Sequence, residues 1–157
     1  MEAKQLFLFF SLLFLIGLTG IPLNGGDLSA YHNFAQVADG GDYRTSFLLL
    51  NPQDEYIQIT LTFRNDSGEG WVVSLNGVVG SSFTHSIPPR GVLRLETDRI
   101  SASVKTGWAE LTAQGEIGAQ AFFEVYSGEQ LITQAAVEST GPLHNVYLFV
   151  EELSLIH

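Results

Sequence analysis

The sequence of 157 residues contains no cysteine, which excludes a disulfide framework, a thiolate metal site, a thiol nucleophile and a lipid-bearing cysteine. Basic residues are also scarce, because 7 lysines and arginines stand against 17 aspartates and glutamates, giving a formal net charge of −10. Such a chain repels phosphate backbones, so we expect no nucleic-acid partner. The acidic excess is typical of a soluble surface, and attraction of cations is the alternative. Stability must come from a hydrophobic core, which a chain of this length can build.

Long apolar runs are limited to residues 6–18, which follow a short head that carries Lys4. The run has about 13 residues, the length of a signal-peptide core, and falls short of the roughly 20 that a membrane-spanning helix needs. We therefore expect a signal peptide over residues 1–20, cleaved between residues 18 and 31, and a linker over residues 21–30. The mature protein would be secreted or held at the cell surface, with no stable membrane span. An uncleaved anchor or a buried strand is the alternative.

Amphipathic helical patterns are absent after this segment, and short strands punctuated by glycine or proline take their place. The pattern is clearest in residues 34–52. An alternating strand leads into Asp39-Gly40-Gly41-Asp42, where two glycines supply the positive φ angles of a tight turn. An apolar strand over residues 43–50 follows, and Pro52 ends it, because proline cannot donate a hydrogen bond to a sheet.

The same reading applied to the whole chain predicts nine or ten strands. They are expected at residues 31–38, 43–50, 55–63, 71–75, 78–83, 92–97, 108–113, 117–126, 131–137 and 146–150. The third of them has the clearest alternation, which places Ile57, Ile59, Leu61 and Phe63 on one buried face. Strands at this spacing predict an all-β, antiparallel sandwich, with residues 31–157 as one domain that includes a C-terminal strand and tail. A barrel is the alternative.

Residues in the first turn and its flanking strands also form a motif. It reads phenylalanine, two residues, an apolar residue, Ala-Asp-Gly-Gly, then an aromatic residue, a threonine, an apolar run and Asn-Pro. Its members are Phe34, Val37, Ala38, Asp39, Gly40, Gly41, Tyr43, Thr45, Leu48, Leu50, Asn51 and Pro52. The motif resembles an uncharacterised β-sandwich domain of secreted and surface proteins of environmental bacteria, often present as tandem copies. The resemblance implies an immunoglobulin-like fold and export, and it implies no activity and no functional residues.

Two acidic loops contain the oxygen ligands that Ca²⁺ prefers. One holds Asp39 and Asp42, and the other holds Asn65, Asp66, Ser67 and Glu69. Neither loop matches a complete calcium-binding pattern. We therefore expect ordinary turn chemistry, in which Asp and Asn side chains bond their own backbone. Calcium is the alternative, and no other cofactor is expected.

Catalytic signatures are not evident in the sequence. The four histidines, at positions 32, 85, 144 and 157, lack the spacing of a helical metal pair, although a sheet could unite His32 with His144. A Gly-x-Ser-x-Gly elbow and a phosphate-cradling loop are both missing. We expect a protein that is not an enzyme. A hydrolase with paired carboxylates stays open, because their separation is spatial.

Aromatic residues are candidates for stacking on sugar rings. The two assigned to ligand contact are Trp71, which follows a polar loop, and Tyr43. Burial in the core is the competing interpretation, because an aromatic side chain buries about 150–250 Å². Trp108 alternates within a strand and is expected in the core. Exposed aromatics would favour a carbohydrate-binding module for a surface polysaccharide.

The last apolar run is similar to the first strand. Residues 31–39 align without gaps to residues 143–151, and both segments read His-Asn, an apolar stretch and an acid. Either chance produced this likeness, or the C-terminal strand is the opening of a second copy. The strands proposed for assembly carry Phe34, Val37, Val146, Leu148 and Val150. An open sheet edge accepts further strands. We therefore expect a non-catalytic structural or adhesive protein that joins itself head to tail, as a filament or matrix subunit would. A monomer whose last strand pairs internally is the alternative.

Overall fold

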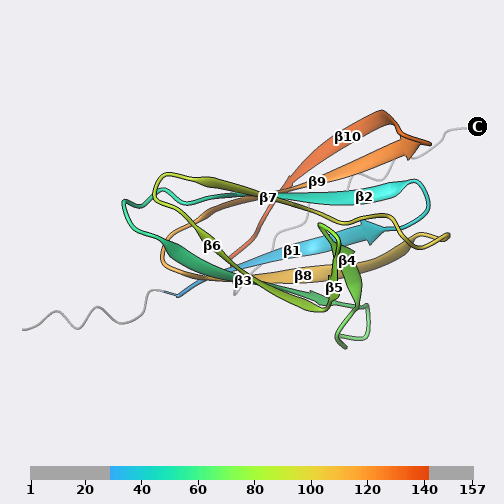
Figure 1. The fold of residues 1–157 in the computed structure, drawn as a ribbon. Coiled ribbons are helices and arrows are strands. Elements are labelled where there is room, and N and C mark those ends of the chain that lie inside the picture. The colour runs from blue at the N-terminus through green and yellow to red at the C-terminus, as the bar shows by residue number, and fades with distance from the viewer. Residues whose placement is uncertain (1–28, 142–157) are drawn as a thin grey trace, which may run out of the picture.

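The structure, a computed structural model, describes residues 29–141 as ten β-strands without a helix (Figure 1). The strands are β1 (Ser29–Asp39), β2 (Tyr43–Leu50), β3 (Ile57–Arg64), β4 (Val73–Leu75), β5 (Val78–Gly80), β6 (Ser82–Ile87), β7 (Val92–Glu96), β8 (Lys105–Gln114), β9 (Gly118–Ser127) and β10 (Gln130–Glu138).

Eight of these strands form two four-stranded sheets. Sheet A has the order β1-β8-β3-β6, and sheet B has the order β10-β9-β2-β7, while β4 and β5 form a small hairpin. Every pair of neighbouring strands is antiparallel. The predicted all-β, antiparallel sandwich is therefore confirmed.

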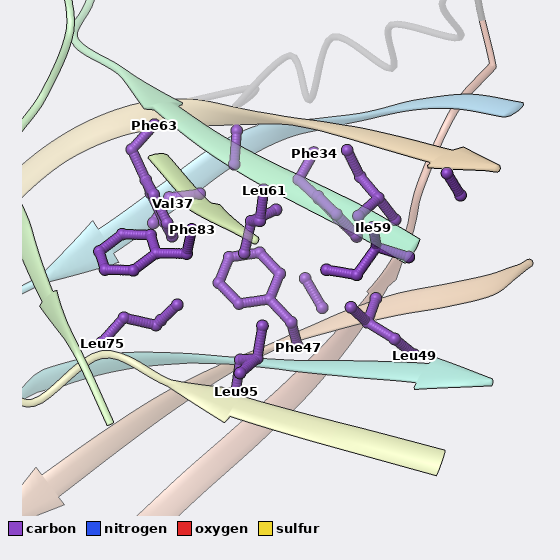
Figure 2. Packing of buried hydrophobic residues seen from close by; sticks show 14 of the residues in the cluster. Phe34, Val37, Phe47, Leu49, Ile59, Leu61, Phe63, Leu75, Phe83 and Leu95 are labelled. Carbon is purple, nitrogen blue, oxygen red and sulfur yellow. The ribbon is translucent and has the colours of Figure 1, made fainter. Parts of the chain in front are cut away.

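The core lies between the two sheets and is built on aromatic rings (Figure 2). Phe47 of sheet B contacts Phe34 and Phe63 of sheet A edge to face, with ring centroids 5.0 and 5.7 Å apart. Phe63 in turn contacts Phe83, at 5.8 Å. The four apolar residues predicted to share one face of β3 are all buried. Edge-to-face contacts of this kind add to the free energy gained by burying the rings.

The turn at Gly40 and Gly41 is present, but it is a corner between the sheets and not a hairpin within one sheet. Gly40 and Tyr43 exchange both backbone hydrogen bonds, at 3.0 Å each. Beyond them β1 pairs with β8, and β2 pairs with β9 and β7. Thr45 holds the diverging strands together, because its hydroxyl accepts from Ala38 N (3.0 Å) and donates to Ala38 O (2.9 Å).

Other residues of the motif also satisfy buried backbone groups. Asn51 is fully buried, and its amide nitrogen donates to the carbonyl groups of Glu55 (2.7 Å), Ile87 (3.2 Å) and Pro88 (3.0 Å). Buried carbonyl groups without partners would destabilise the fold. The motif therefore fixes the path of the chain between strands.

Several strand boundaries differ from those predicted. β1 begins at Ser29, inside the stretch expected to be a linker, because Ser29 and Ala30 pair with Gln114 and Ala113 of β8. The strand expected at 78–83 is divided at Ser81 into β5 and β6, and β6 continues to Ile87. The signal peptide and the strand expected at 146–150 lie outside the described residues.

Candidate functional site

The open edge of sheet B is the surface best suited to contact another molecule. β10 pairs with β9 on one side only, and all nine of its residues are exposed. Leu131, Ile132 and Val137 are 45%, 57% and 41% exposed. β10 has no proline and no lysine, the residues with which proteins commonly protect an edge. A strand of this kind offers unpaired peptide groups beside apolar side chains.

Burial decreases step by step from the centre of sheet B to this edge. In β2, Phe47 is fully buried, and Ala121 beside it in β9 is 1% exposed. Phe123, two residues further along the same face of β9, is only half-buried. Ala135, which pairs with Phe123 in β10, is exposed. In Figure 1 the β9–β10 hairpin diverges from sheet A, so the inner face of β10 extends beyond the core.

β1, the corresponding edge of sheet A, is not open in the same way. Phe34 and Val37, both proposed as assembly residues, are 1% and 0% exposed and belong to the core. Their side chains therefore pack within their own sandwich and do not face a neighbour. Part of the outer backbone edge of β1 is already paired within the chain, because the backbone of Asn33 exchanges hydrogen bonds of 2.7 and 2.9 Å with the backbone of Thr140. The partner residues proposed in the C-terminal segment, Val146, Leu148 and Val150, lie outside the described residues.

The chain leaves β10 through a hydrogen-bonded link to β1. Ser139 Oγ donates to the carbonyl of Ala119 (3.0 Å) and lies 2.9 Å from His32 Nδ1. Since the hydroxyl proton is used in the first bond, His32 Nδ1 is the donor in the second. Burial lowers the pKa of His32 below its ordinary value. His144, which a sheet could bring beside His32, lies outside the described part of the chain.

A buried carboxylate, which no sequence motif marks, lies on the outer face of sheet B. Glu124 is 1% exposed and accepts hydrogen bonds from Ser46 (2.9 Å), Tyr126 (2.8 Å) and Arg94 (3.1 Å). Burial, together with the Glu124 carboxylate, raises the pKa of Tyr126. These partners satisfy the carboxylate within the sheet, so the network has a structural role. Only the pairing of β2, β7 and β9 brings its members together, and no local sequence signal reports that pairing.

The two tryptophans have positions opposite to those predicted. Trp71 is 8% exposed and packs in the core, where its ring is 6.3 Å from that of Phe63. It is therefore not available to stack on a ligand. The chain folds back after the polar loop, through a bridge between Arg64 and Gly70, and this places Trp71 inside. Trp108 instead lies half-buried on the outer face of sheet A, with the Arg64 guanidinium 5.7 Å from its ring. Tyr43, the other ligand candidate, is 41% exposed at the corner after β1.

The loop at Asn65 shows the expected turn chemistry, whereas the side chain of Asp39 bonds a distant segment of the chain. Asp39 is buried and accepts a hydrogen bond from the Arg99 backbone (3.0 Å). Asn65 Oδ1 accepts from the backbone of Ser67 (3.0 Å) and of Glu69 (2.9 Å). Within residues 29–141, no three histidine, aspartate or glutamate side chains are grouped so as to hold a metal ion.

Comparisons with known proteins bear on the fold alone. No protein-family model and no curated protein matches the chain. The chain is similar to a solved structure described as the crystal structure of Thermotoga maritima 1070, with a TM-score of 0.50 and 13% sequence identity. That match covers 71% of this chain and 92% of the other. Between residues 29 and 141 there is no helix with the length and apolar character needed to cross a membrane.

Proposed function

We propose that this protein is a non-catalytic, exported structural or adhesive subunit whose copies join head to tail by strand addition. In this assembly, residues 143–151 of one copy pair with the open edge of β10 in the next. The observation that carries the proposal is the complete exposure of β10, an apolar strand paired on one side only. Head-to-tail contacts of this type generate rings or open filaments.

The energetics of β10 favour a partner. A strand that buries no side chain depends on one ladder of hydrogen bonds and is marginally stable by itself. Covering an exposed Leu, Ile or Val side chain contributes up to about 1.5–3 kcal/mol. An added strand would also satisfy the free peptide groups along the outer edge of β10.

Residues 143–151 are suited to this edge by length and composition. The segment has the same length as β10, nine residues, and contains five consecutive apolar residues at 146–150. In an extended strand, Val146, Leu148 and Val150 share one face, and Tyr147 and Phe149 share the other. Both faces of β10 are exposed, so both rows of side chains would find apolar surface.

The path of the chain disfavours the β10 of the same copy as the acceptor. Thr140 already pairs with Asn33, so the chain has left sheet B for sheet A before it reaches residue 141. To pair with its own β10, it would have to reverse within the few residues before 143. A second copy presents the same edge without that constraint.

Export is the part of the proposal that rests on the N-terminal sequence. The apolar run of residues 6–18 supports a signal peptide and therefore a secreted or cell-surface location. Mass spectrometry of the secreted protein should find a new N-terminus between residues 18 and 31. Recovery of the intact chain from the cytoplasm would contradict export.

Deletion of residues 143–157 tests the assembly. We expect the exported full-length protein to sediment as oligomers, and the deletion variant to sediment as a folded monomer. A synthetic peptide of residues 143–151 should bind to that monomer. A matched peptide with serine in place of Val146, Leu148 and Val150 should not bind. A full-length protein that stays monomeric at high concentration, or a deletion variant that unfolds, would contradict the proposal.

Binding of a surface polysaccharide is the second candidate function. Trp71 is buried and Tyr43 lies at a corner, so these two residues do not form a platform for sugars. The observation that favours this function lies elsewhere, at Tyr31 on the outer face of sheet A, where an exposed ring lines an uncharged groove.

A further inference from the structure

We propose that the outer face of sheet A carries a binding groove for a neutral oligosaccharide, with Tyr31 as its stacking platform. The proposal is independent of the assembly of copies, because the groove lies on sheet A and the open edge of β10 belongs to sheet B.

The groove is formed by side chains from three adjacent strands. β8 lies between β1 and β3, and Tyr31 of β1 pairs with Thr112 of β8, which in turn pairs with Thr60 of β3. These outward-facing residues border a hollow of about 210 Å³. Its polar and aromatic lining consists of Ser29, Tyr31, Gln58, Thr60, Thr112 and Gln114.

The lining contains hydroxyl and amide groups and no charged residue. Gln114 Nε2 lies 3.5 Å from Gln58 Oε1, and this weak contact leaves both amides with further donor and acceptor capacity. Threonine hydroxyls both donate and accept. Groups with both capacities match a ligand that is itself covered with hydroxyl groups.

Tyr31 adds an apolar surface to this polar lining. Its side chain is 51% exposed, so the ring is open to a ligand. An aromatic ring with a polar tip suits a ligand that has apolar C–H groups on one face and hydroxyl groups at its rim. A wholly apolar ligand would leave the surrounding threonine and glutamine groups without partners.

Charge decides between sugars and nucleotides, which also stack on aromatic rings. The chain has a net charge of −10, and the groove has no basic residue with which to bind a phosphate. Anionic polysaccharides are disfavoured for the same reason. A neutral oligosaccharide is therefore the ligand class that fits both the lining and the charge.

Affinity electrophoresis on native gels tests this site. The full exported protein is run through gels that contain xyloglucan, galactomannan, xylan, mixed-linkage β-glucan or amylose, with polygalacturonate as the anionic comparison. The readout is the mobility of each variant relative to its own mobility without polysaccharide. The variant is Tyr31→Ala, and Tyr43→Ala and Tyr56→Ala are matched controls, because both tyrosines are exposed and lie outside the groove.

We expect at least one neutral polysaccharide to retard the wild-type protein and both controls. Tyr31→Ala should bind that polysaccharide about tenfold more weakly. Absence of retardation in all five neutral gels, or equal retardation of Tyr31→Ala, would overturn the proposal. Stronger retardation by polygalacturonate than by any neutral polymer would overturn the assignment of a neutral ligand.

Discussion

At the scale of single residues, Phe63 lies at the centre of the core. It is fully buried and contacts the rings of Phe47, Trp71 and Phe83 edge to face. Loss of this ring would leave a cavity bordered by all three partners. The residues around it belong to both sheets, so they hold the sandwich together.

We expect Phe63→Ala to lower the free energy of unfolding by roughly 3–5 kcal/mol. Chemical denaturation of the purified protein measures this loss. Tyr56→Ala is the matched control, because Tyr56 is 71% exposed and its removal should change stability by no more than about 0.5 kcal/mol. A loss below about 1 kcal/mol for Phe63→Ala would contradict its place in the core.

The two glycines at the corner between β1 and β2 differ in their surroundings. Both have positive φ angles, 96° at Gly40 and 58° at Gly41. A Cβ atom at Gly40 would lie 2.5 Å from the carbonyl oxygen of Ser103 and 2.8 Å from Ser101 Cβ. At Gly41 the nearest atom would be 3.5 Å away.

Gly40→Ala should therefore destabilise the protein more than Gly41→Ala. We expect about 1 kcal/mol for Gly41→Ala, from the left-handed backbone alone, and at least about 2 kcal/mol for Gly40→Ala. Thermal denaturation of the two variants side by side provides the comparison. Equal losses would show that the contacts at Ser101 and Ser103 do not constrain the corner.

The burial of His32 makes stability depend on pH. Burial lowers the pKa of His32 in the folded chain, so the unfolded chain takes up this proton first as the pH falls. The unfolded state then binds more protons, and the free energy of unfolding decreases from about pH 7 to about pH 5. His32→Gln should show a smaller decrease than the wild type in denaturation at these pH values. An unchanged decrease in His32→Gln would contradict the prediction.

At the scale of secondary structure elements, β10 is a strand without a buried face. Substitution of its exposed residues therefore affects what it contacts more than how the domain folds. Ile132→Lys places a charge where an incoming apolar strand would pack, and Ile132 is already 57% exposed. We expect the unfolding free energy to change by no more than about 0.5 kcal/mol while the oligomers are lost.

Denaturation and sedimentation of the same Ile132→Lys sample separate these two effects. Val79→Lys is the matched control, because Val79 is 65% exposed in the small β4–β5 hairpin, outside sheet B. It should assemble like the wild type. Oligomers that persist in Ile132→Lys would show that β10 is not the assembly edge.

The strands themselves were predictable where local patterns are strong. β2 coincides with the predicted residues 43–50, because an apolar run there is bounded by glycine and Asn-Pro. Its partner strands were not predictable, since β1 and β2 are joined by a tight turn yet belong to different sheets. Pairing of β1 with β8, and of β2 with β9, places the two strands in different sheets. These long-range pairings leave no local pattern in the sequence.

The candidate site was predictable only in part. The sequence predicts an open edge and places Phe34 and Val37 on a possible assembly strand, and the structure shows both side chains buried in the core. The sequence predicts β10 as a strand. Its run Leu-Ile-Thr-Gln-Ala-Ala-Val does not alternate consistently, so the pattern does not show that both faces of the strand are exposed. The burial of Trp71 was not predictable for a similar reason, because the chain folds back through the bridge between Arg64 and Gly70 and turns this ring inward.

At the scale of the whole molecule, the sandwich presents two separate surfaces. The edge of sheet B is apolar and open to a strand, whereas the groove at Tyr31, on the outer face of sheet A, has a polar and uncharged lining. Their separation would allow an assembled subunit to bind polysaccharide while its edge strand is occupied. Both proposed roles are binding roles and would need no catalytic residue.

The absence of cysteine makes the central claim directly testable by cross-linking. One variant carries Thr133→Cys in β10, and a second, distinguishable by a tag, carries Leu148→Cys in the C-terminal segment. The two are mixed and treated with a short bis-maleimide linker, and the products are identified by mass. We expect a dimer that contains one chain of each variant. A third variant carries both substitutions in one chain and is treated in the same way. Absence of the mixed dimer, together with a cross-link inside the single chain of this double variant, would show that the segment pairs with its own β10. That result would contradict head-to-tail assembly.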